Sequence, residues 1–237
     1  MTLFKNVALI VLAGVAGLLI GRSIYGNNPA HGVVSAAAPQ AEAPLPKDID
    51  PKTRNRFPEL KPEDMDAETR KLAEETHSGK HFTPGLRMYS PRLAEPLSKA
   101  HYYLKYESGL GDRYIEIAVL MAGRGMNNQF EWTQWEGHAR KETGDSHLDD
   151  NLIDIIKYRK PVVGLGEKET AIIKMGRGIF DDRKISPEVF ADTVRLFGRR
   201  GTVDLVELMG LYSQTAVELI AFDQQLNPGQ KPLLPVR

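Results

Sequence analysis

The sequence predicts an all-α domain that follows an N-terminal apolar segment and a linker rich in proline and alanine. Two observations support the fold class. Apolar residues recur with helical spacing through the C-terminal part of the chain, and no segment there alternates apolar and polar residues convincingly as a half-buried strand does. A third observation, one uncharged apolar run near the start, sets the N-terminal segment apart. We therefore divide the 237 residues into a signal or anchor helix over 1–25, a flexible linker over 26–58 and a helical domain over 59–233.

The N-terminal segment has the pattern of an export signal. Lys5 precedes an uncharged apolar run from Val7 to Ile20, which ends before Arg22. This run is shorter than the roughly 17–25 residues of a full membrane span. With apolar flanks and snorkelling basic residues at both ends, residues 3–25 would also serve as an uncleaved membrane tether. A cleaved signal and a retained anchor both predict export, to the periplasm or to the membrane face that borders it.

The linker is defined by its prolines. Proline lacks a backbone donor and restricts the residue before it, so closely spaced prolines prevent a stable helix. The linker includes Pro39, Pro44, Pro46, Pro51 and Pro58. We expect a flexible, partly extended tether.

Seven or eight helices are expected in the domain, and most of their ends carry a capping residue, glycine or proline. They span approximately residues 66–76, 93–106, 112–122, 128–143, 148–158, 167–180, 187–198 and 203–222. Residues 84–91 are expected to form a loop. The helix over 112–122 is apolar nearly all round and should be central. The last helix is long, but Asp204, Glu207 and Glu218 argue against a membrane span.

Composition excludes several classes of function. The chain has 31 basic and 31 acidic residues, so its net charge gives no electrostatic basis for nucleic acid as a main partner. It has no cysteine, which excludes a disulfide framework, a thiolate zinc site and cysteine redox chemistry. The pair His77 and His81 flanks a loop and is by itself a weak metal site. We expect neither a metal nor a cofactor.

Several separated motifs occur in the order found in one known family. They are Arg113 with Glu116-Ile117-Ala118-Val119-Leu120, Gln129-Phe130-Glu131-Trp132, the upstream Ser90-Pro91-Arg92-Leu93-Ala94, and the downstream Arg200-Gly201-Thr202-Val203-Asp204-Leu205-Val206 and Ala221-Phe222. Over about residues 58–233 the chain resembles the carboxymuconolactone decarboxylase family. The resemblance implies the alkylhydroperoxidase-like helical fold, a small-molecule substrate, and a homotrimer or homohexamer.

The chain departs from that family at two points. The peroxidase branch uses a Cys-x-x-Cys pair as its redox relay, and a chain without cysteine cannot reduce peroxides by that route. The decarboxylase branch usually has Glu-Trp-x-x-His. Here Trp135 stands four residues after Glu131, and the nearest histidine is His138.

One helix face collects the residues with the most chemistry. Glu131, Trp135 and His138 are spaced i, i+4, i+7 and therefore share a face. The carboxyl group and the imidazole lie about 10 Å apart along the helix axis, which leaves room for a small substrate between them. Trp135 would form the apolar floor of that site, with Trp132 beside it. A glutamate against indole rings should have a raised pKa, as a general acid requires.

The family resemblance suggests a role for each residue. Loss of carbon dioxide from a carboxylated lactone leaves a dienolate that must be protonated at carbon, and Glu131 would supply that proton. Arg113 would hold a substrate carboxylate through two hydrogen bonds. His138 or His101 would donate a hydrogen bond to the developing oxyanion.

Each of these residues also has a structural interpretation. Glu131 would pair with Arg113 or Arg124 and only fix helix packing, and Glu116 on the central helix would be a buried ion-pair partner. His138 would face water. Both tryptophans would anchor the core or a subunit interface.

Two functions therefore compete. The first is a lyase-type enzyme that uses general-acid chemistry on a small carboxylated or lactone compound. The second is a non-catalytic exported oligomer of the same fold that binds or scaffolds. A cavity lined by Glu131, Arg113 and a histidine would favour the enzyme, and a carboxyl group salt-bridged in a dry core would favour the scaffold.

Overall fold

The computed structural model describes residues 44–76, 82–142 and 144–235. The predicted signal or anchor helix over 1–25 lies outside these residues, as does the linker up to residue 43. Every regular element of the described part is a helix, and no strand occurs there. None of its helices is both long enough and apolar enough to cross a membrane.

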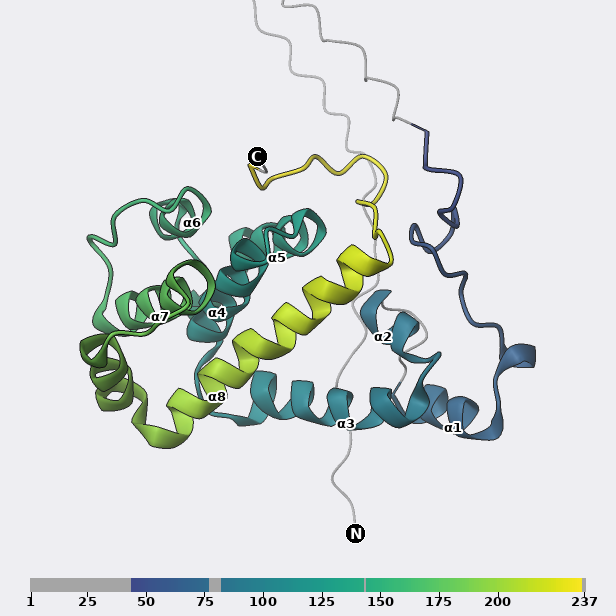
Figure 1. Cartoon of the computed structure of the whole chain (residues 1–237), viewed down its shortest axis with the longest axis horizontal. Coiled ribbons are helices and arrows are strands. Elements are labelled where there is room, and N and C mark those ends of the chain that lie inside the picture. The colour runs from purple at the N-terminus through teal and green to yellow at the C-terminus, as the bar shows by residue number, and fades with distance from the viewer. Residues whose placement is uncertain (1–43, 77–81, 143, 236–237) are drawn as a thin grey trace, which may run out of the picture. The chain divides into compact units, whose positions relative to one another are not determined.

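Eight α-helices and four short 3-10 or π-helical turns make up the described part (Figure 1). They are η1 (Pro62–Asp64), α1 (Ala67–Thr76), α2 (Phe82–Arg87), α3 (Pro91–Tyr102), η3 (Tyr103–Glu107), α4 (Asp112–Gly125), α5 (Gln129–Lys141), η4 (Gly144–Ser146), α6 (Asp150–Lys157), α7 (Glu167–Arg177), η5 (Gly178–Asp182) and α8 (Pro187–Ala221). The all-α prediction is confirmed for these residues.

Side-chain caps explain why several helices start where the sequence predicts. Asp66, Asn128, Asp149 and Ser186 each accept a hydrogen bond from the backbone N–H three residues later, at 2.7–3.3 Å. Such a bond satisfies one of the donors that the first helical turn leaves without a partner.

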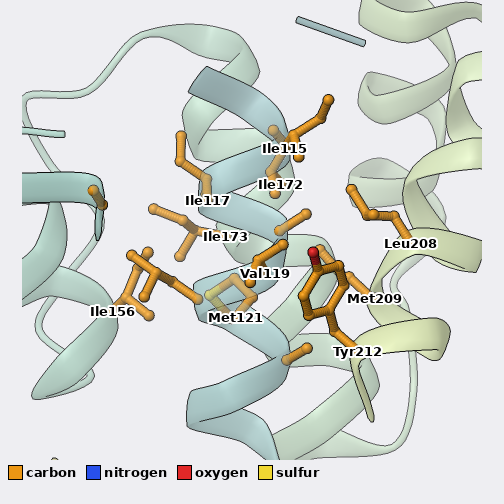
Figure 2. Packing of buried hydrophobic residues seen from close by; sticks show 14 of the residues in the cluster. Ile115, Ile117, Val119, Met121, Ile156, Ile172, Ile173, Leu208, Met209 and Tyr212 are labelled. Atoms are coloured by element: carbon orange, nitrogen blue, oxygen red, sulfur yellow. The ribbon is translucent and has the colours of Figure 1, made fainter. Parts of the chain in front are cut away.

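The central helix is α4, which packs against α5, α6, α7 and α8. Nearly all of its residues are buried, and Ile117, Val119 and Leu120 are fully shielded from solvent. Figure 2 shows side chains of α4, such as Val119, packed together with those of α7, such as Ile172, and of α8, such as Leu208. The predicted central position of this helix is confirmed.

The structure differs from the prediction at the end of α4. The sequence predicts this end near residue 122, before two glycines, but the helix continues through Gly123 and ends at Gly125. Helix α5 packs on Gly123, where an added Cβ would lie 3.6 Å from Cγ of Glu131. At Gly125 an added Cβ would clash with the ring of Phe180 at 2.2 Å. These glycines therefore allow close packing of neighbouring elements, which sequence alone does not distinguish from helix termination.

The long helix α8 is two helices joined at Gly198, whose φ of 69° and ψ of 173° are not helical. The sequence places a boundary at this point. Past the break, the hydroxyl of Thr202 donates to the carbonyl oxygen of Gly198 at 2.7 Å. Only glycine adopts this backbone conformation without strain, so Gly198 sets the change in direction.

Two segments expected to be irregular or flexible are ordered by contacts. The first residues of the predicted 84–91 loop belong to α2, which spans Phe82–Arg87. The end of the predicted linker lies against the C-terminal end of α8. There the amide of Arg56 donates to the carbonyl oxygen of Phe222 at 3.0 Å, and the ring of Phe57 meets that of Phe222 edge-on. Tertiary contacts hold this part of the linker, and its composition does not reveal them.

Candidate functional site

The carboxyl group of Glu131 is buried without a partner. Its side chain lies in the first turn of α5, the residue is 2% exposed, and neither carboxyl oxygen has a hydrogen bond to the described part of the chain. Burial raises the pKa of Glu131 well above its ordinary value, and no neighbouring charge is a cause. The expected ion pair with Arg113 or Arg124 does not form. Burial therefore favours the protonated, uncharged form of this acid.

Local structure fixes this carboxyl group between two helices. Asn128 caps α5 by accepting from the amide of Glu131 at 2.8 Å, and its own amide group donates to the carbonyl oxygen of Ala216 in α8 at 3.1 Å. On the other side the chain approaches α4 at Gly123. The cap residue thus ties the first turn of α5 to α8 and holds Glu131 inside the protein.

A second buried acid, Glu116 of α4, connects the interior with the surface. The residue is 4% exposed, and its Oε2 lies 3.5 Å from Nδ1 of His138. The imidazole is about half exposed, and its Nε2 lies 3.1 Å from Glu142. Burial raises the pKa of Glu116, and the charges of Lys105 and His138 oppose that rise. The structural interpretation of Glu116 as a buried ion-pair partner agrees with this geometry.

Trp135 contacts two aromatic rings and a lysine. Its ring meets the ring of His138 at 5.3 Å and that of Tyr212 at 5.4 Å, both edge to face. The ammonium group of Lys105 lies 4.1 Å from the centre of the indole, a cation–π contact. Burial lowers the pKa of Lys105, and the negative charge of Glu116 opposes this.

A tyrosine–histidine pair lies next to Trp135. Tyr212 of α8 is buried, and its hydroxyl lies 3.2 Å from Nε2 of His101; Figure 2 shows the ring pointing toward α4. Burial raises the pKa of Tyr212, and the charges of Glu116 and Glu131 add to the rise. Burial, together with Lys105, lowers the pKa of His101 to about 4. At neutral pH the pair is uncharged and offers hydrogen bonds.

These contacts, together with the effect of the Glu131 charge on the pKa of Tyr212, define the α5 cluster. It contains Glu131, Trp135, His138, His101, Glu116, Lys105 and Tyr212. The first four are among the residues that the sequence singles out. Lys105 and Tyr212 are missed because they come from η3 and α8, far away in the chain, and lie in no motif with the others.

Arg113 does not join the α5 cluster. It donates to the carboxylates of Glu169 and Asp149 and to the carbonyl oxygen of His147. It lies at the start of α4, ten residues before the point where Glu131 packs, which is roughly 15 Å along the axis. The role predicted for Arg113 beside Glu131 does not fit this position.

Trp132 belongs to the hydrophobic core. It is fully shielded from solvent, and its indole nitrogen donates to the carboxylate of Glu136. The same carboxylate holds Lys157 at 3.0 Å and Arg140 at 2.8 Å. With no exposed surface and its one polar atom engaged, Trp132 anchors packing, as its structural interpretation predicts, and not a substrate.

Two cavities of the described part lie outside the α5 cluster. One is a groove of about 800 Å³ on α8, lined by residues from Phe190 to Glu207. The other, of about 230 Å³, lies between the end of η3 and α8 and is lined in part by Ser108 and Arg200. Among the described residues, no group of three His, Asp or Glu side chains is arranged to hold a metal ion.

Comparisons with known proteins show the fold. No protein-family model and no curated protein matches the sequence. One solved structure superposes with a TM-score of 0.51 at 17% identity, over 60% of this chain and 95% of the other. It is a protein of unknown function from Agrobacterium tumefaciens, described as a candidate antioxidant defence protein AhpD. The chain has the alkylhydroperoxidase-like fold. At this identity the likeness extends to the fold alone.

Proposed function

We propose that the chain is a carboxymuconolactone decarboxylase-like, lyase-type enzyme that protonates a small carboxylated or lactone compound through Glu131. The observation that supports this most directly is the buried carboxyl group with no hydrogen bond to either oxygen. Burial of an unsatisfied acid reduces stability, and such groups are concentrated at functional sites. A raised pKa favours the protonated form that a general acid needs.

In the proposed reaction the bond between the substrate carbon and its carboxylate breaks, and carbon dioxide leaves. The electron pair remains on the substrate as a dienolate, and Glu131 transfers its proton to carbon. Glu131 is then a carboxylate in a site that disfavours charge, so it takes a proton back from water. The ion-pair contact between Glu116 and half-exposed His138 supports a path for protons from the surface.

The position of Arg113 argues for another anchor for the substrate carboxylate. Lys105 makes no ion pair with a described carboxylate and lies over the indole of Trp135. Burial strengthens the interaction of an ammonium group with an incoming anion. Lys105 therefore takes the binding role in the proposal. The hydroxyl of Tyr212, held by neutral His101, is the donor for the developing oxyanion.

The test begins with a substrate. Small lactones and unsaturated carboxylic acids are screened by thermal shift, because a ligand that binds only the folded state raises the melting temperature. Turnover is then measured by carbon dioxide release. Glu131→Gln should reduce kcat by roughly 10²–10⁴-fold. Lys105→Met should chiefly raise KM.

A matched control is Gln134→Ala on the same helix, whose side chain bonds Gln230 at 2.7 Å and should leave turnover unchanged. Rates should fall as pH rises through the raised pKa of Glu131, since only the protonated acid donates. Full activity in the Glu131→Gln variant would remove the central claim.

The second function, a non-catalytic exported oligomer that binds or scaffolds, is favoured by the cavities. Neither of the two described above includes a residue of the α5 cluster. In this case the chain is a homotrimer or homohexamer in the periplasm or tethered to its membrane, and Glu131 serves no reaction. No small acid or lactone would then shift the melting temperature, while the assembly would persist in Glu131→Gln.

A further inference from the structure

The outer face of α8 beyond Gly198 is apolar and exposed. Val203 is 58% exposed, Val217 53% and Val206 39%. Figure 1 shows α8 lying across the front of the helical unit, with no described element drawn over it. We call this face the α8 stripe, which consists of Arg199, Val203, Val206, Gly210, Gln214, Val217 and Ala221. All are exposed except the half-buried Gln214.

The α8 stripe is symmetric about its middle residue. Its members lie 4, 7 and 11 positions before and after Gly210. At 3.6 residues per turn, all of them fall within about 40° of one line along the helix. Two valines, Val203 and Val217, occupy equivalent places on the two sides. In an antiparallel pair of stripes, Val203 would therefore meet Val217 of the partner subunit, and Val206 would meet the partner's Gln214, in an interface with two-fold symmetry.

The middle of the stripe permits close approach. An added Cβ at Gly210 would have no heavy atom within 4 Å. The residue has helical backbone angles, and no packing within the described part of the chain explains its lack of a side chain. A glycine at the crossing point of two helices lets their backbones come near, whereas in an exposed helix interior it otherwise only reduces stability.

We propose that two copies of this chain pair through antiparallel α8 helices that cross at Gly210. Charged residues make up 26% of the chain, yet none occupies the six stripe positions from Val203 to Ala221. Uncharged, exposed positions in such a row are expected where another apolar surface covers them. The occupant is a second copy because the stripe complements itself.

The charges at the ends of the stripe are complementary in this arrangement. Arg199 lies 11 residues before Gly210, and Asp223 lies 13 residues after it. Within the described part of the chain, neither side chain has an ion pair. Antiparallel pairing places Arg199 level with the last residue of α8 in the partner subunit, and Asp223 of the partner subunit follows that helix end by two residues. The pair would form twice, once at each end.

The groove on α8 supplies the remaining contact area. Two helix faces of 23 residues, each about 34 Å long and 10 Å wide, bury roughly 700 Å² together, less than the roughly 1,600 Å² of a typical stable interface. The groove of about 800 Å³ continues from the stripe, with Phe190, Val194 and Val203 in its lining. Exposed Ile220 of the partner subunit would lie at the level of residue 200, next to this groove.

Single cysteines test the geometry, because the full chain has none of its own. Gly210→Cys should cross-link to itself under mild oxidation. Val203→Cys and Val217→Cys should each stay uncross-linked alone, since two copies of position 203 would lie about 21 Å apart. A mixture of these two variants should form a heterodimer. Val163→Cys, exposed on a loop, is the control and should not cross-link.

Sedimentation of the full-length chain provides an independent test. The unmodified chain should form an assembly with an even number of copies, as in a hexamer built from two trimers and unlike a single trimer. Gly210→Gln should raise the dissociation constant of the pairing at least tenfold. It leaves the separated chains as stable as before or more stable, because glutamine favours a helix and its Cβ meets open space.

Self-cross-linking of Val203→Cys would overturn the proposal, because it indicates parallel helices. An unchanged mass for Gly210→Gln would also overturn it, as would a chain that sediments as a single copy at all concentrations. The proposal is independent of any reaction at Glu131, so the two can fail separately.

Discussion

Two glutamates on the same helix, Glu131 and Glu136, are equally buried and have opposite surroundings. Both residues are 2% exposed. Glu136 accepts from Trp132, Arg140 and Lys157, so its charge is fully compensated. Glu131 has no partner at either oxygen. Burial alone therefore does not define a site, and the partners decide whether a buried acid is structural or available for chemistry.

The largest expected effect comes from breaking the compensated acid. Glu136→Gln should lower the free energy of unfolding by roughly 3–5 kcal/mol, because it leaves the ammonium group of Lys157 buried without a carboxylate. Urea denaturation of the full-length chain measures this. Lys141→Gln, exposed on the same helix, is the control and should stay within about 0.5 kcal/mol. A loss below 1 kcal/mol for Glu136→Gln would mean that its ion pairs do not distinguish Glu136 from Glu131 in stability.

Replacement of the uncompensated acid Glu131 is expected to raise stability, the opposite of the effect at Glu136. Glu131 has a folded-state pKa above its unfolded value near 4.5. The unfolded state therefore ionises first, and stability falls as pH rises from about 4.5 toward the folded pKa. Glu131→Gln removes this loss and should be more stable than the unmodified chain at pH 8, by roughly 1–3 kcal/mol. Denaturation curves at pH 5 and pH 8 should show the gap widening with pH. A constant gap would mean that Glu131 finds a partner.

His101 extends the comparison to a base, because this half-buried imidazole is held neutral. Its pKa in the folded state is about 4, against 6.5 ordinarily. The folded state therefore binds fewer protons within this window, and stability is complete above pH 6.5 and is lost as pH falls toward 4. His101→Gln, which keeps a hydrogen bond to Tyr212, should flatten the acid side of the stability profile. Melting temperatures between pH 4 and 7 test this, and an unaltered slope would assign the loss to other groups.

The smallest effect is expected at the surface end of the α5 cluster. His138 is about half exposed, so His138→Gln should change the free energy of unfolding by less than about 1 kcal/mol. Its consequence appears at Glu116, whose pKa the imidazole helps to lower. Carboxyl infrared bands should show Glu116 protonated to higher pH in the variant. An unchanged band would indicate that Lys105 alone sets that pKa.

Much of the fold follows from local sequence, and the exceptions have physical causes. Caps such as Asn128 and Ser186 act within three residues, so the sequence places their helices. The glycines of α4 look like terminators, yet they accommodate α5 and Phe180. The linker's prolines predict flexibility, but contacts with the distant C-terminal end of α8 hold its last part. Errors thus occur where a neighbour remote in sequence decides the outcome.

For the candidate site, the sequence by itself determined that Glu131, Trp135 and His138 share one helix face, because helical spacing is a local property. It also excluded cysteine chemistry and gave the helical architecture. The tertiary structure decided the rest. It turned Arg113 toward Glu169, buried Trp132 against Glu136, and brought Lys105 and Tyr212 beside the acids. The physical reason is that ion pairs and burial depend on which surfaces of separate helices meet, and no spacing along the chain encodes that.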